Sequence, residues 1–175
     1  MPSQNLLEMV FDYQLLLSKR DRLGVPLDDD EQLRWLALDR LLTSSRRDDA
    51  AGHAAHHDGG RGMDRVPFGG DAGFTTPGGF ETGEVKNLCG SGVAIASARP
   101  APVGSRVVLR LVDGDRGREY FFPCRVAWSR RGVLAGMGLS FDGAPSRTDY
   151  VTEETTGVWS RSVRMGTPPR RAHSA

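Results

Sequence analysis

The sequence predicts a mainly β protein, in which a small six-stranded antiparallel β-barrel follows an N-terminal α-helical hairpin. Apolar residues recur at intervals of three and four between residues 5 and 42, as on one face of a helix. Between residues 84 and 141 they alternate with polar residues, and glycine-rich turns rather than helical patterns separate the alternating runs. Short strands joined in this way form an antiparallel meander, which removes its exposed edges by closing into a barrel.

Residues 1–43 are expected to form the helical hairpin. Residues 5–23 contain no Gly or Pro, and Gly24-Val25-Pro26 ends this first helix. The acidic run Asp28–Glu31 suits the positive end of a second helix, whose apolar stripe runs from Leu33 to Leu42. Two helices alone bury too little surface to be stable. Residues 5–42 therefore either dock on the β body or pair with another protein, and a homodimer is one form of that second alternative.

The segments on either side of the barrel are expected to be irregular. Residues 44–60 are rich in small and polar residues without periodicity, which is typical of a flexible linker. Its three histidines are interpreted as solvated, because a structural metal site needs a fixed scaffold. No metal or cofactor is predicted. Residues 150–175 are expected to form a C-terminal segment and a frayed tail.

A glycine-rich corner, E-V-K-N-L-C-G-S-G-V-A-I over residues 84–95, organises the barrel of residues 61–149. Glycine at such a corner lets a backbone or a ligand approach closely. Alternating strands follow over residues 105–112, 119–129 and 135–141, with Trp128 expected on an inward face and Pro123 at an edge or bulge. Residues 69–80 contain too many glycines to predict a well-formed first strand.

Composition and spacing argue against several classes of function. The net charge is +1, and the aromatic residues are expected inside, so no stacking platform for nucleic acid is predicted. No window approaches the ~18 apolar residues of a membrane span, and two cysteines are too few for a disulfide framework, so a cytoplasmic protein is expected. No paired carboxylates and no Cys-His or Ser-His spacing support an enzyme.

Three motifs in order resemble the PilZ domain, a bacterial module that often receives cyclic di-GMP. They are Arg61-x-x-x-Arg65, then Asn87-x-Cys89-x-x-Gly92, then a β-rich body that ends on V-x-W and G-x-G-x-x-F. The resemblance covers residues 61–143. It implies that Arg61 and Arg65 contact guanine faces and phosphates, that Asn87 bonds a guanine edge, and that Gly92 allows close backbone approach.

Cys89 stands where the PilZ family has serine. A thiol is a weaker hydrogen-bonding group than a hydroxyl, and Ser91 is not expected to replace the missing one. The leading hypothesis is therefore a cyclic di-GMP effector with a weakened site. Through a protein partner it would regulate motility, cell polarity or exopolysaccharide production. The alternative is a degenerate PilZ adaptor that binds no nucleotide and serves as a protein-docking scaffold.

Overall fold

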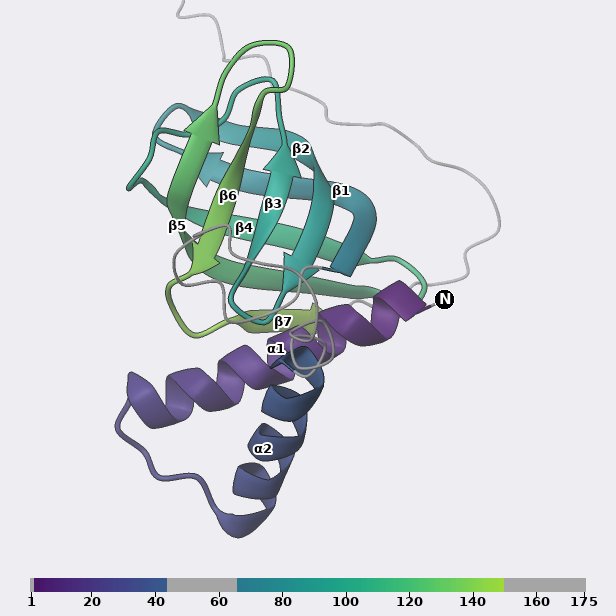
Figure 1. The fold of residues 1–175 in the computed structure, drawn as a ribbon, viewed down its shortest axis with the longest axis vertical. Coiled ribbons are helices and arrows are strands. Elements are labelled where there is room, and N and C mark those ends of the chain that lie inside the picture. The colour runs from purple at the N-terminus through teal and green to yellow at the C-terminus, as the bar shows by residue number, and fades with distance from the viewer. Residues whose placement is uncertain (1, 44–65, 150–175) are drawn as a thin grey trace, which may run out of the picture.

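A computed structural model describes residues 2–43 and 66–149 of the 175-residue chain (Figure 1). The expectations for the linker 44–60, for Arg61 and Arg65, and for the tail 150–175 lie outside these residues. The described part contains two helices and seven strands.

The helical hairpin is confirmed as α1 (Pro2–Asp21) and α2 (Asp29–Thr43). Gly24, which follows α1, has a φ of 64°, a left-handed conformation that suits glycine at the end of a helix. A capping box begins α2. The N–H of Glu31 donates to Asp28 Oδ1 at 2.8 Å, and the N–H of Asp28 donates to Glu31 Oε2 at 3.1 Å.

Six of the strands form the predicted antiparallel barrel. They are β1 (Val66–Thr76), β2 (Gly79–Cys89), β3 (Gly92–Ala96), β4 (Arg106–Asp113), β5 (Arg118–Arg130) and β6 (Gly136–Phe141). Their order is β4-β1-β2-β3-β6-β5, and β4 also pairs with β5, which closes the sheet. The seventh strand, β7 (Ser146–Asp149), pairs with the first residues of β5.

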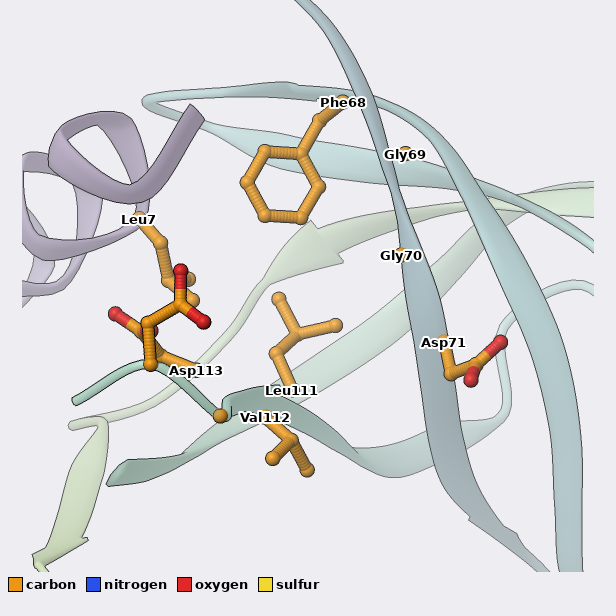
Figure 2. Close-up of a pocket in the computed structure, with 10 residues that line it drawn as sticks. Leu7, Phe68, Gly69, Gly70, Asp71, Leu111, Val112 and Asp113 are labelled. Atoms are coloured by element: carbon orange, nitrogen blue, oxygen red, sulfur yellow. The ribbon is translucent and has the colours of Figure 1, made fainter. Parts of the chain in front are cut away.

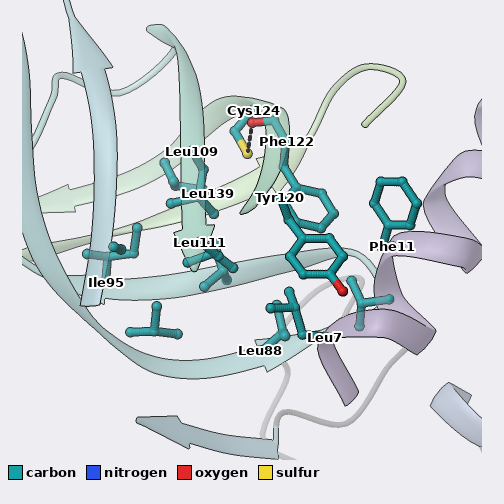
Figure 3. Close-up of a cluster of buried hydrophobic side chains, with 14 of the residues drawn as sticks. Leu7, Phe11, Leu88, Ile95, Leu109, Leu111, Tyr120, Phe122, Cys124 and Leu139 are labelled. Carbon is teal, nitrogen blue, oxygen red and sulfur yellow. Dashed lines mark hydrogen bonds between the residues drawn. The ribbon is translucent and has the colours of Figure 1, made fainter. Parts of the chain in front are cut away.

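The barrel interior is filled by the predicted period-two alternation. In β4, Val107, Leu109 and Leu111 are all buried. Tyr120, Phe122 and their alternate neighbours in β5 face them, and the thiol of Cys124 donates to the carbonyl of Phe122 (Figure 3). One continuous core therefore joins the barrel wall to the side chains of α1 that cover it.

Two expectations for individual strands were wrong. Strand β1 is well formed along 11 residues, because Phe74 is fully buried and Gly73 is covered by the ring of Phe80, which compensates for the missing side chain. Trp128 does not face inward, because an irregularity in the β5–β6 register between Val126 and Trp128 turns the indole to the outer surface.

Pro123 lies where β5 changes partner. Residues 118–121 pair with β7 and residues 124–130 pair with β6. Between these two stretches, the carbonyl of Pro123 accepts a hydrogen bond from the N–H of Asp142 at 2.8 Å. Neither β6 nor β7 needs an N–H donor from residue 123, so proline, which has none, is tolerated there. The expected edge or bulge is thus a junction between two partner strands.

The hairpin docks on the barrel of its own chain through α1. The ring of Phe11 packs edge-on against Tyr120, with ring centroids 5.4 Å apart (Figure 3). Ser18 Oγ donates to the carbonyl of Gly143 at 3.2 Å. In contrast, α2 packs on α1 and points away from the barrel, which leaves Leu33 and Leu36 66% and 49% exposed (Figure 1). Docking is thereby confirmed for α1, while the homodimer stays a prediction.

The two ends of the barrel differ. We call one the helix end, because α1 contacts its connections, which are residues 90–91, 114–117 and 142–145. We call the other the open end, and it comprises residues 77–82, 97–105 and 130–135. Strand direction alone separates these two sets of loops, since consecutive antiparallel strands turn at alternate ends.

Candidate functional site

The predicted glycine corner is the connection between β2 and β3, at the helix end. Leu88 is fully buried and points into the barrel, so its neighbours Asn87 and Cys89 face outward, since successive side chains of a strand alternate. Asn87 is half-buried and pairs with Pro67 of β1 and with Ala94 of β3. The corner therefore directs Asn87 and Cys89 to the same outer face.

Cys89 is held by local contacts rather than left reactive. Its side chain is 6% exposed, its Sγ donates to the carbonyl of Gly92 at 3.4 Å, and it lies 3.4 Å from Ser91 Oγ. Ser91 was not expected to replace the family's serine. The turn nevertheless brings its hydroxyl beside the thiol, so a hydroxyl group is present next to the position where the family pattern places one.

The outer face beside the corner has a shallow cleft of about 100 Å³, which we call the corner cleft. Its lining includes Cys89, Ser91, Gly92, Trp128, Gly138 and Ser140. The indole of Trp128 rests on Gly138, where a Cβ would clash with the ring. Trp128 was not predicted on this face, because unbroken alternation along residues 119–129 would have turned its side chain inward. The signal was the pair Gly136 and Gly138, which leaves the outer face of β6 bare for a ring.

Gly92 has a role in the fold that is independent of any ligand. A Cβ at this position would clash with the carbonyl oxygen of Leu139 on β6. The close approach that glycine allows here is therefore between β3 and β6. The proposed approach of a ligand backbone or phosphate to Gly92 stays a prediction.

Helix α1 contacts the corner directly. The buried side chain of Gln14 donates from Nε2 to the carbonyl of Gly90 at 2.5 Å. This bond joins residues 76 positions apart in the sequence. Because a buried carbonyl that loses its donor carries a desolvation cost, the position of α1 and the backbone of the corner are linked.

A charged network fixes the other half of α1 to the barrel. The carboxylate of Glu8 accepts a hydrogen bond from the hydroxyl of Tyr120 at 2.5 Å. It also forms ion pairs with Arg118 at 3.0 Å and with Arg147 at 2.7 Å. Burial alone would raise the pKa of Glu8, but the Tyr120 hydrogen bond and the two guanidinium groups outweigh it and lower that pKa. Burial, together with the bond to Glu8, raises the pKa of Tyr120 to about 12.

A second cavity, of about 390 Å³, lies between α1 and the barrel (Figure 2). Leu7 and Asp113 lie on one side of it, Gly70 and Asp71 on the other, and Phe68 reaches across its upper part (Figure 2). Asp115 also lines it. Three carboxylates repel phosphate groups, so this cavity does not suit an anionic nucleotide although it is larger than the corner cleft.

The described residues contain neither a group of metal ligands nor a helix that could span a membrane. Within residues 2–43 and 66–149, no three His, Cys, Asp or Glu side chains are grouped so that they could hold a metal ion. Neither of the two described helices is long and apolar enough to cross a membrane. The polar and aromatic groups that line the corner cleft are the hydroxyls of Ser91 and Ser140, the thiol of Cys89 and the indole of Trp128.

Comparison with known proteins places this chain in a family. The model of the PilZ domain matches residues 61–152, which is more than half of the chain, so the chain belongs to the PilZ domain family. In general, PilZ domains are signalling modules that bind cyclic di-GMP. The match includes both Arg61 and Arg65 and the whole barrel, but it excludes the helical hairpin.

Among solved structures, the chain is similar to the crystal structure of the PilZ domain of CeSA from a cellulose-synthesizing bacterium. The two are 23% identical, the match covers 46% of this chain and 82% of the other, and the TM-score is 0.38. The comparison with curated proteins gives no match.

Proposed function

We propose that this protein is a cyclic di-GMP receptor that binds the nucleotide across the corner cleft and transmits binding through α1. The observation that carries the proposal is that Ser91 and Trp128 line the corner cleft, while the strand register places Asn87 on the same outer face, in line with Ala94 and Gly138. Arg65 directly precedes Val66, and Val66 pairs with Leu88 at this same corner. The sequence thus joins the arginine motif to the strand next to the cleft.

Each group suits one part of the ligand. The indole of Trp128 offers a face on which a guanine ring can stack, and the Asn87 amide can both donate to and accept from a base edge. Arg61 and Arg65 supply planar guanidinium groups for phosphates and guanine faces. The cleft is shallow, so the nucleotide would lie across the surface. The segment that carries Arg61 and Arg65, which we call the arginine arm, would then cover the nucleotide.

The output would be a change in the docking of α1. A ligand that favours one backbone conformation of the corner also favours or disfavours the bond from Gln14 to Gly90, and so shifts the population of docked α1. The exposed side chains of Leu33 and Leu36 on α2 would then meet a protein partner in one state only. This cytoplasmic, non-enzymatic switch would regulate motility, polarity or exopolysaccharide production.

Calorimetric titration of cyclic di-GMP into the full-length protein tests the proposal. Arg61→Ala/Arg65→Ala should abolish binding, and Trp128→Ala should weaken it about tenfold or more, because a base stacked on an aromatic ring contributes roughly 1–3 kcal/mol. Cys89→Ser should tighten binding several-fold. The matched control is Arg130→Ala/Arg131→Ala at the open end, which should bind as the wild type does.

A second candidate function is a PilZ adaptor that acts without nucleotide, and Cys89 is the observation that favours it. The thiol is buried and already donates a hydrogen bond to the carbonyl of Gly92. The hydrogen bond to the nucleotide that the resemblance assigns to serine at this position is therefore weakened. No binding heat from a folded wild-type protein at high ligand concentration would sink the receptor proposal and leave the adaptor. Binding that persists in Arg61→Ala/Arg65→Ala would contradict the assigned site.

A further inference from the structure

The turn between β5 and β6 presents two apolar side chains at the tip of the open end. The N–H of Ala135 donates to the carbonyl of Gly132 at 3.1 Å, so Gly132–Ala135 form a tight turn with Val133 and Leu134 at its centre. Val133 is 102% exposed and Leu134 is 73% exposed. The central positions of such turns usually carry Gly, Pro, Asn, Asp or Ser, and the exposed pair has no role in the barrel core.

Two arginines, Arg130 and Arg131, directly precede this turn. The open end contains Arg99, Arg130 and Arg131, and Glu81 is its one carboxylate. Glu81 pairs with Arg99 at 3.3 Å, whereas within the described part of the chain Arg130 and Arg131 have no ion-pair partner. Since the whole chain has a net charge of only +1, the open end concentrates positive charge that the rest of the chain balances.

The neighbouring loop extends the same surface. The N–H of Ser97 donates to the carbonyl of Ala135 at 3.2 Å, which joins the loop after β3 to the β5–β6 turn. That loop carries Val103, another exposed apolar side chain. The β5–β6 turn therefore combines the exposed side chains of Val133 and Leu134 with Arg130 and Arg131, which have no ion-pair partner among the described residues.

We propose that the open end docks on the surface of a membrane that contains anionic lipids. Val133 and Leu134 insert at the boundary between headgroups and acyl chains, and Arg130 and Arg131 contact lipid phosphates. A lipid surface fits better than a protein partner because the tip is a two-residue convex turn. A stable protein interface buries about 800 Å² on each partner and needs a complementary shape, whereas a bilayer accepts a protruding tip without one.

This contact would orient the protein. The β5–β6 turn lies at the end of the barrel away from α1 and α2 (Figure 1), so docking would leave the helical hairpin facing the aqueous side. The proposal does not depend on nucleotide binding, because no residue of the tip lines the corner cleft.

Co-sedimentation of the full-length protein with unilamellar vesicles tests the proposal. Binding is expected to vesicles with 30% phosphatidylglycerol in phosphatidylcholine, to be much weaker to pure phosphatidylcholine, and to fall as salt rises. Arg130→Gln/Arg131→Gln should weaken binding by roughly five-fold for each charge removed. Val133→Ser/Leu134→Ser should weaken it by about tenfold or more. The matched control is Leu33→Ser/Leu36→Ser on α2, which removes two exposed apolar side chains elsewhere and should bind like the wild type.

A labelled variant reports insertion directly. Leu134→Cys carrying bimane should show a blue-shifted emission on adding the anionic vesicles, and both native cysteines are buried, so the new thiol is the accessible one among the described residues. Failure of the wild type to bind anionic vesicles would overturn the proposal. Loss of binding in the α2 control with retention in both tip variants would also overturn it. A bimane spectrum unchanged by bound vesicles would exclude insertion of the tip.

Discussion

The charge on Glu8 is predicted to hold α1 on the barrel, and Glu8→Gln removes that charge with little change in shape. Glu8 accepts a hydrogen bond from Tyr120 and pairs with Arg118 and Arg147. A hydrogen bond to a charged group contributes about 1.5–3 kcal/mol, and each partly exposed ion pair contributes about 0.2–1 kcal/mol. Glutamine keeps one acceptor oxygen, so the expected loss of unfolding free energy is about 2 kcal/mol.

Urea denaturation of the full-length protein measures this loss, and Glu119→Gln is the matched control. The side chains of Glu8 and Glu119 are 25% and 24% exposed, but Glu119 forms its ion pair with Arg110, within the barrel wall between β4 and β5, whereas the pairs of Glu8 join α1 to the barrel. The control should lose only about 0.5 kcal/mol. Equal losses in the two variants would refute the reasoning, because the helix contact would then add nothing to an ordinary surface pair.

The pH dependence of the same difference gives a second check. The pKa of Glu8 in the folded protein lies below its ordinary value of 4.5, so the folded state favours the ionised carboxylate. The extra stability of the wild type over Glu8→Gln should be fully present above pH 4.5 and disappear as the pH falls below that value. An advantage that is unchanged at pH 3 would contradict the assigned role of the charge.

Three further predictions concern the corner and the core. Gly92→Ala should lower the free energy of unfolding by roughly 1–3 kcal/mol, because its Cβ clashes with Leu139, whereas Gly69→Ala, with open space around its Cβ position, should cost much less in the same urea titration. Gln14→Ala should destabilise by about 1–3 kcal/mol because it leaves the Gly90 carbonyl without its donor, and unchanged stability would show that the bond is dispensable. In a Cys89→Ser background, Cys124 should resist a thiol reagent at pH 8 until the protein unfolds, since burial raises the pKa of its thiol; rapid modification of the native protein would contradict this.

Local sequence rules predicted the parts of this fold that local forces decide. The glycine after α1 and the acidic residues before α2 act on residues only a few positions away. The end of α1 and the start of α2 could therefore be predicted from the sequence. The alternation of Val107, Leu109 and Leu111 needs only one buried face, and it was correct. The resemblance to the PilZ domain predicted in addition that the arginine arm and the corner belong to one site, and that prediction stays open. The resemblance itself is confirmed by the family match.

Features that depend on distant residues could not be predicted in this way. Strand β1 looked too rich in glycine, because its stability comes from an aromatic ring on β2 that lies over Gly73. Trp128 was predicted to face inward, but one irregular residue in a strand moves the side chains that follow it to the opposite face of the sheet. The bond from Gln14 to Gly90 requires knowing which face of α1 docks, and a helical stripe by itself does not identify its partner.

Strand β7 has a consequence for solubility. It is the outermost strand of the sheet, since the order ends on it and its only strand partner among the described residues is β5. An unpaired strand edge is a template on which a second molecule can add its own strand. This edge is only four residues long, all of them exposed, and it includes both Arg147 and Asp149. Short length and charge discourage edge-to-edge aggregation, so the one described strand outside the closed barrel is a poor template for pairing with a second molecule.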